Sequence, residues 1–180
     1  MIIQKYKIVF AGSMGAGKTE AIKALSEIPV LATETLNTDP NAHIKQLTTV
    51  GIDYGEITLD DGHKIGLYGT PGQNRFDFMW GVISKGSIGT IILIDHTVSQ
   101  PLDELNHYLN IFQQYSDNIA IGITHVDKNP EQSTHQYRQW LVEHGLHYPL
   151  FYVDAREKKH VLMLIETLIT NLEIKYLQGT

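Results

Sequence analysis

The chain has 180 residues, of which 42% are hydrophobic and 19% charged, and its formal net charge is −6. This length and composition suit one globular domain with a single buried core, which we expect to span residues 1–180. The negative charge disfavours a nucleic-acid-binding protein, because a phosphate backbone is bound by a basic surface.

The sequence contains no cysteine and no long hydrophobic run. Without cysteine there is no disulfide, no thiol nucleophile and no prenyl or palmitoyl attachment site. A membrane-spanning helix needs about 20 consecutive apolar residues, and runs such as residues 90–94 are far shorter. We therefore expect a cytoplasmic protein without an integral membrane segment.

Strand and helix patterns alternate along most of the chain. Four apolar runs predict buried parallel strands, at residues 8–11, 88–95, 119–124 and 150–153. Residues 52–59 and 65–67 flank a turn sequence and predict one antiparallel pair. Together with apolar residues at helical spacing, these patterns predict a three-layer α/β sandwich. Its sheet is six-stranded and mostly parallel, with one antiparallel edge strand.

The most specific motif is Gly-Ser-Met-Gly-Ala-Gly-Lys-Thr at residues 12–19, between an apolar run and a helix-like segment. This pattern is typical of a phosphate-binding loop. Its glycines let successive backbone N–H groups point inward, and the following helix adds partial positive charge. The lysine can reach terminal phosphates, and the threonine hydroxyl can bind magnesium. The predicted nucleotide-contacting residues of the loop are Gly12, Gly15, Ala16, Gly17, Lys18 and Thr19.

Asp127 follows the predicted strand 119–124, at the edge of the sheet where ligands of such folds bind. A carboxylate there can accept hydrogen bonds from both the N1 and N2 donors of guanine. Adenine lacks these donors, so the site would leave the carboxylate buried and unpaired and would reject adenine. The alternative is that Asp127 caps the next helix, ahead of Pro130.

A second short segment, Asp154-Ala155-Arg156, ends the next predicted strand in the same way. It could present a backbone N–H group to the oxygen of the guanine ring. Taken alone, the tripeptide does not distinguish a nucleotide site from an ordinary loop.

Five segments occur in an order and spacing that resemble those of one family. They are the phosphate loop, Thr-Val-Gly-Ile-Asp-Tyr at 49–54, Thr-Pro-Gly-Gln at 70–73, and the segments 124–127 and 154–156. Over essentially the whole chain they resemble Ras-like small GTPases, which are P-loop NTPases. Thr-Pro-Gly-Gln, in place of the usual Asp-Thr-Ala-Gly-Gln, is similar to a bacterial branch, the gliding-motility (Mgl-type) and conservon-associated GTPases.

The resemblance implies that the chain binds GTP or GDP with Mg²⁺ and works with a protein effector or activating protein, such as a Roadblock/LC7-type partner. Thr49, with Thr48 as the adjacent alternative, would reach magnesium and the γ-phosphate. The Gly72 N–H would contact the γ-phosphate, and Gln73 would orient the attacking water. The alternative for Gln73 is an ordinary solvent-facing residue at the start of a helix.

Two of the motifs depart from those of the family. The aspartate that normally precedes the second switch is Gly69 here, and our candidate replacement near magnesium is Asp53, acting through a water. Its alternative is an exposed strand residue. The usual Asn-Lys-x-Asp is Thr-His-Val-Asp, so Thr124 and His125 replace an amide and a lysine. This change could weaken guanine affinity, although His125 could stack on the base and Asp127 would keep the selectivity.

Arginine occurs only at positions 75, 138 and 156, so none lies between the phosphate loop and Gln73. The first switch therefore cannot supply an arginine finger, a group worth about 10³ to 10⁵ in turnover. We expect slow intrinsic hydrolysis that waits for a partner to supply or reposition a catalytic group.

The predicted second-switch helix carries two apolar stripes. One comprises Phe76, Met79, Trp80 and Ile83, and the other Phe78 and Val82. If the second stripe stays exposed, it would form an effector surface whose position depends on the γ-phosphate. The alternative is that both stripes are covered within the domain.

These observations favour a GTP-binding molecular switch that hydrolyses GTP slowly to GDP and signals to a partner through two switch segments. The first alternative is a pseudo-GTPase that acts as a nucleotide-dependent binding module, favoured by Gly69 and the altered base motif. The second is an ATPase or small-molecule kinase, for which a lid or an acceptor site would be expected.

Overall fold

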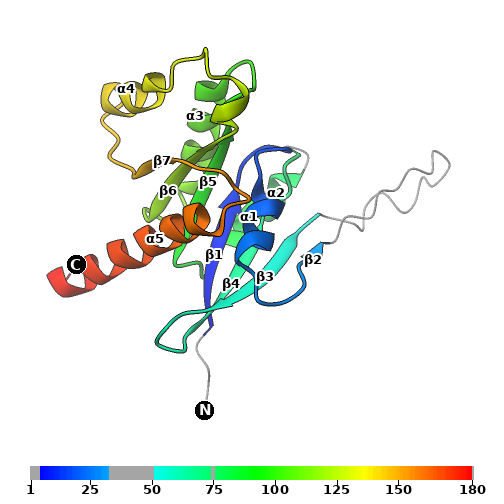
Figure 1. The fold of residues 1–180 in the computed structure, drawn as a ribbon. Coiled ribbons are helices and arrows are strands. Elements are labelled where there is room, and N and C mark those ends of the chain that lie inside the picture. Colours follow the sequence, from blue (N-terminus) through cyan, green and yellow to red (C-terminus); the bar gives the residue numbers. More distant parts are fainter. Residues whose placement is uncertain (1–4, 33–50, 74–75, 180) are drawn as a thin grey trace.

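The computed structural model describes residues 5–32, 51–73 and 76–179. Its centre is a twisted sheet with helices on both faces (Figure 1). The strands lie in the order β2-β3-β4-β1-β5-β6-β7. Their bounds are β1 Lys5–Ala11, β2 Leu31–Ala32, β3 Asp53–Thr58, β4 Lys64–Gly69, β5 Gly89–Asp95, β6 Ile119–Thr124 and β7 Leu150–Tyr152. The helices are α1 Lys18–Leu25, α2 Phe78–Ser84, α3 Pro101–Phe112, the 3₁₀ turn η2 Val126–Lys128, α4 His135–Glu143 and α5 Lys158–Gln178.

The sheet is parallel from β4 through β1, β5 and β6 to β7, and β3 runs antiparallel to β4. The predicted three-layer α/β fold is therefore confirmed. The structure adds the strand β2, which pairs antiparallel with β3 beyond the predicted elements. Two residues are too few to show the alternation by which strands are recognised in a sequence.

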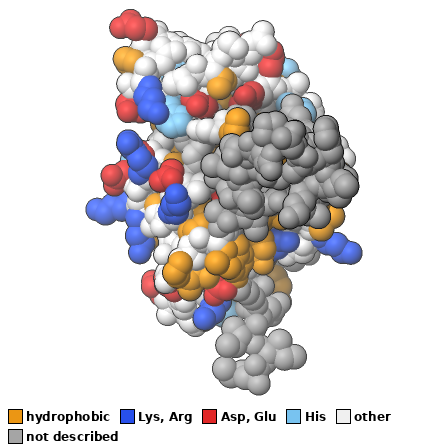
Figure 2. All heavy atoms as spheres, turned by 90° about the vertical axis from the view of Figure 1, so that its right-hand side faces the viewer, with side chains coloured by type: hydrophobic (Ala, Val, Ile, Leu, Met, Phe, Trp, Pro, Cys, Tyr) orange, Lys and Arg blue, Asp and Glu red, His pale blue; other side chains and the backbone are white. Residues whose placement is uncertain are grey.

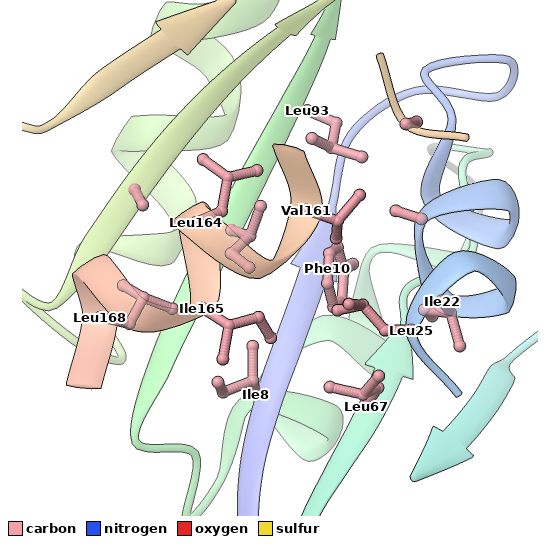
Figure 3. Close-up of a cluster of buried hydrophobic side chains, with 14 of the residues drawn as sticks. Ile8, Phe10, Ile22, Leu25, Leu67, Leu93, Val161, Leu164, Ile165 and Leu168 are labelled. Carbon is pink, nitrogen blue, oxygen red and sulfur yellow. The ribbon is translucent and has the colours of Figure 1, made fainter. Parts of the chain in front are cut away.

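The central strands are buried on both faces, and successive residues point to opposite sides of the sheet. In β1, Ile8 and Phe10 join one buried cluster, whereas Val9 joins the other. The first cluster packs under α1 and α5, and Figure 3 shows Ile22 and Leu164 from these helices beside the sheet. The second cluster packs under α2, α3 and α4. The unbroken apolar runs of the sequence therefore correspond to strands with a core on each face.

Helix α2 buries only one of its two apolar stripes. Trp80 and Ile83 belong to the second core cluster, and the Trp80 ring stacks on Phe112 at 5.7 Å between centroids. The side chains of Phe78 and Val82 are each 66% exposed. Of the two alternatives for this helix, the structure therefore supports the one with an exposed second stripe.

The edge of the sheet that ends in β2 is partly apolar at its surface. Leu31 on β2 is 61% exposed. Figure 2 views this edge and shows hydrophobic side chains gathered in the lower half of the face.

None of the helices in the described ranges combines the length and the hydrophobicity that a membrane-spanning helix needs.

Candidate nucleotide-binding site

The phosphate loop connects the end of β1 to the start of α1, as the sequence predicts. Gly12, Gly15 and Gly17 have φ angles of 140°, 88° and 101°, which are strained for any residue with a side chain. Gly17 is the residue before α1, and no side chain caps the first turn of this helix. The first N–H groups of a helix have no partner within it, so they are suited to bind an anion.

Lys18 lies folded against the loop from which it projects. Its ammonium group donates hydrogen bonds to the carbonyl oxygens of Gly12, at 2.6 Å, and Ser13, at 2.7 Å. The side chain is only 7% exposed. This burial lowers the pKa of Lys18 to about 8, and the nearby carboxylates of Asp53 and Glu104 oppose the shift. A buried cation held by neutral carbonyls is well placed to exchange them for phosphate oxygens.

Thr19 and Asp53 form the candidate magnesium side of the site. The Thr19 hydroxyl donates a hydrogen bond to the Asp53 carboxylate, which is buried at 7% exposure. The alternative of an exposed strand residue at position 53 is therefore wrong. Asp53 lies opposite Gly69 in the β3–β4 pair. A hydroxyl and a carboxylate supply the oxygen ligands that Mg²⁺ prefers.

The Thr-Pro-Gly-Gln segment lies against the tip of the phosphate loop. A Cβ atom at Gly72 would lie 2.5 Å from the backbone nitrogen of Met14, so only glycine allows this approach. The segment is held from below, because Thr70 donates to the carbonyl of Phe10 through both its amide and its hydroxyl. Gln73 follows with an exposed side chain. The structure thus brings Gly72 against the phosphate loop, and Gln73 follows it in the chain.

One anchor of this segment was not predicted from the sequence. The indole N–H of the fully buried Trp80 donates to the carbonyl of Pro71 at 3.1 Å. Helical spacing identified Trp80 as a core residue, but gave no signal for the hydrogen bond. The core packing of α2 therefore fixes the backbone directly before Gly72.

The other side of the phosphate loop contacts the two predicted base segments. The buried Thr124 hydroxyl, at the end of β6, lies 3.0 Å from the carbonyl oxygen of Ala16. A Cβ atom at Gly17 would lie 2.8 Å from the Cβ of Ala155. The phosphate loop therefore lies directly against both the segment 124–127 and the segment 154–156.

After β6 the chain turns sharply at His125, which has a φ of 57°. Its Nδ1 lies 3.1 Å from Asp95 Oδ2, within the distance of an ion pair when His125 is protonated. Asp127 follows in η2 with an exposed side chain. The alternative in which Asp127 caps the next helix is wrong, because α4 begins only at His135.

The segment 154–156 is a compact charged turn. The Asp154 carboxylate accepts hydrogen bonds from the Arg156 amide at 2.9 Å and from its guanidinium at 2.7 and 2.9 Å. These contacts hold the pKa of Asp154 well below its ordinary range. The Asp154 amide donates to His160 Nδ1. Within the described residues, no acceptor is found for the third amide of the segment, that of Ala155. The negative charge of Asp127 acts on Arg156, so the two base segments are electrostatic neighbours.

Three residues named in the sequence analysis, Thr48, Thr49 and Arg75, lie outside the described residues.

One contact of the phosphate loop was not predicted from the sequence. Ser13 in the phosphate loop donates to Glu104 on α3, 91 residues away in the sequence. No motif or spacing marks Glu104, so only the fold reveals it.

No protein-family model matches the chain. The chain is 35% identical over 89 residues to an uncharacterized protein of Methanocaldococcus jannaschii, and the match covers 49% of this chain and 50% of that protein. The chain therefore spans only about half the length of this relative.

Two matches extend over most of the chain. Ras-related protein Rab-18 of Lymnaea stagnalis is 25% identical over 168 residues, covering 92% of this chain and 72% of Rab-18. Ras-related protein RabC of Dictyostelium discoideum is 25% identical over 177 residues, covering 93% of this chain and 84% of RabC. The chain is a homologue of Ras-like small GTPases. The bacterial subgroup that the Thr-Pro-Gly-Gln segment resembles is not among these relatives.

The fold of this homologue also matches a solved structure. The G domain of the FeoB iron transporter of T. maritima aligns with a TM-score of 0.65 at 17% identity, covering 93% of this chain and 98% of that domain. The fold is therefore the G-domain variant of the P-loop NTPases.

Proposed function

We propose that this Ras-like homologue is a GTP-binding molecular switch of the Mgl-type or conservon-type branch, with residues 1–180 forming a single cytoplasmic GTPase domain. The observation that supports it best is the position of the phosphate loop between two sets of contacts. Gly17 approaches Ala155 on the base side, and Gly72 packs on Met14 on the opposite side. The phosphate loop thus lies between the segments that would bind the base and the segment that would contact the γ-phosphate.

In this proposal the loop residues Gly12, Gly15, Ala16 and Gly17 bind the phosphates through their N–H groups, and Lys18 neutralises the terminal phosphates. Magnesium is held by the Thr19 hydroxyl, by Thr49 and, through a water, by Asp53. The metal would offset the charge that develops on the phosphate oxygens. The support for Asp53 is its burial beside Gly69 and its hydrogen bond from Thr19.

Asp127 selects guanine by accepting hydrogen bonds from the ring donors that adenine lacks. His125 covers a face of the base, and Thr124 holds the loop against this site. The Ala155 N–H binds the guanine oxygen, with Asp154 and Arg156 fixing the turn. The support here is that both segments contact the phosphate loop.

Hydrolysis in this proposal is the attack of a water oxygen on the γ-phosphorus with release of GDP and inorganic phosphate. Gln73 orients the water and the Gly72 N–H contacts the γ-phosphate. Turnover is slow because the chain supplies no arginine finger from its first switch. The exposed residues Phe78 and Val82 on α2 bind an effector or activating protein, and a Roadblock/LC7-type partner fits the branch that the sequence resembles.

Phosphate release from GTP with Mg²⁺ tests this mechanism. We expect slow single-turnover hydrolysis that Gln73→Leu lowers at least tenfold without changing GTP affinity. Gln113→Leu, at an exposed glutamine directly after α3, should hydrolyse GTP like the natural chain. If the natural chain binds GTP but neither it nor Gln113→Leu releases phosphate, the chain is the pseudo-GTPase alternative that Gly69 and the altered base motif favour. Turnover near or above one per second would also contradict the slow switch.

A further inference from the structure

Helix α3 places a carboxylate on the phosphate loop. The Ser13 hydroxyl donates a hydrogen bond of 3.0 Å to Glu104 Oε2. The carbonyl oxygen of Ser13, like that of Gly12, also accepts a hydrogen bond from Lys18. Glu104 lies in the first turn of α3, and Leu105 beside it is fully buried in the core. The carboxylate is therefore fixed beside the loop by a packed helix as well as by its hydrogen bond.

The charge of Glu104 reaches the phosphate-binding lysine. Among the residues that the structure describes, the carboxylates of Asp53 and Glu104 act on the ammonium of Lys18. Asp53 accepts from Thr19 and lies on the proposed magnesium side. Glu104 instead projects from α3, accepts from Ser13, and has no part in the proposed binding or hydrolysis. Asp103, its neighbour on the helix, is not among the charges that act on Lys18.

Glu104 also lines a cavity of about 500 Å³ between the phosphate loop and α3. Ser13, Met14 and Gly72 form the loop-side wall of this cavity. Gly72 is the residue whose N–H is proposed to contact the γ-phosphate. The carboxylate therefore stands on the side of the loop where GTP would carry a phosphate that GDP lacks.

A fixed negative charge at this position repels a terminal phosphate, and the repulsion is strong where water is partly excluded. GDP ends one phosphate earlier and is repelled less. We propose that Glu104 is a specificity-determining residue that lowers the affinity of the site for GTP relative to GDP. This inference rests on the proposed function, because it presumes a guanine nucleotide in the loop.

Calorimetric titration of GDP and of a non-hydrolysable GTP analogue, both with Mg²⁺, tests the proposal. Glu104→Gln removes the charge and keeps an oxygen that can accept from Ser13. We expect it to raise the ratio of GTP to GDP affinity by about three- to tenfold. Glu104→Lys reverses the charge and should raise the ratio further. Asp103→Asn removes an exposed carboxylate from the same cavity and should leave the ratio within about twofold of the natural chain.

The ratio distinguishes a charge effect from a structural one. If Glu104 only supported the loop, Glu104→Lys would weaken both nucleotides together and the ratio would not rise. An unchanged ratio in both Glu104 variants would overturn the inference and leave the proposed function intact. Absence of GDP and GTP binding in the natural chain would instead overturn the proposed function.

Discussion

Asp53 and Gly69 face each other across the β3–β4 pair, and the side chain of Asp53 fills the space beside Gly69. A Cβ atom at position 69 would lie 3.1 Å from the Asp53 Cβ and 3.2 Å from Asp53 Oδ2. A side chain at position 69 would therefore press on Asp53, whose carboxylate accepts a hydrogen bond from Thr19. We propose that Asp53 on the adjacent strand takes the place of the aspartate that the family carries at position 69.

This relationship predicts a carboxylate swap. Asp53→Ala should lower the Mg²⁺-dependent part of nucleotide affinity by about 10- to 100-fold, the range typical of residues that support a metal. Gly69→Asp alone should destabilise the fold, because two carboxylates would crowd one site. The double variant should recover most of the Mg²⁺ dependence. Asp60→Asn, at the exposed turn after β3, is the control and should bind nucleotide like the natural chain. If Asp53→Ala shows the same Mg²⁺ dependence as the natural chain, Asp53 does not support the metal.

The lowered pKa of Lys18 predicts proton uptake on nucleotide binding. Burial puts this pKa at about 8 in the free protein, and phosphate oxygens would raise it. Below pH 8 the ammonium is already charged, so affinity should vary little. Above pH 8 binding requires a proton, and affinity should fall by up to about tenfold per pH unit.

Titration calorimetry in two buffers of different ionisation enthalpy, at pH 8 to 9, measures this uptake directly. Burial also lowers the pKa of Lys7, which donates to the carbonyl of Lys85 away from the site. Lys7→Arg should therefore leave the uptake unchanged. Affinity that stays constant from pH 7.5 to 9.5 would show that Lys18 does not meet the phosphates.

Alanine substitutions at Gly17 and Gly15 distinguish the cost of backbone strain from the cost of a steric clash. Both have positive φ, so an alanine at either position costs about 1–2 kcal/mol of unfolding free energy. Only at Gly17 does the new Cβ also meet Ala155, whereas nothing lies within 4 Å at Gly15. Urea denaturation should show the larger loss for Gly17→Ala. Ala155→Gly in the same chain should recover part of that loss, and no recovery would mean that the two loops do not pack as described.

The two apolar stripes of α2 predict opposite responses to truncation. Trp80→Ala should lower the free energy of unfolding by about 3–5 kcal/mol, because Trp80 is fully buried and aromatic. Phe78→Ser and Val82→Ser remove exposed side chains and should change it by less than about 0.5 kcal/mol. A large loss in either serine variant, seen in urea denaturation, would show that the second stripe is covered.

The sequence was sufficient to predict the fold because each central strand carries an unbroken apolar run and each helix an apolar stripe. The phosphate loop was predictable because Gly12, Gly15 and Gly17 are needed for the backbone itself. The sequence left open whether Asp53 lies near magnesium or is an exposed strand residue, and its burial in the structure excludes the exposed alternative. Spacing alone also could not choose the buried stripe of α2, since both stripes are apolar.

Contacts that depend on how the helices pack could not be predicted from the sequence. Glu104 meets Ser13 because α3 packs beside β5, and Trp80, buried in the core under α2, donates to the carbonyl of Pro71. Both bonds join side chains to loops without a periodic pattern. The sequence therefore predicts which segments form the site, and the fold determines which side chains support them.

Competition of GTP and ATP for the purified chain, measured by calorimetry with Mg²⁺, tests the guanine-switch proposal most directly. We predict that GTP and GDP bind and that ATP binds at least about 100-fold more weakly, because adenine would leave the Asp127 carboxylate without donors. Asp127→Ala should remove most of this preference. Equal affinity for GTP and ATP in the natural chain, or no binding of either, would contradict the proposal.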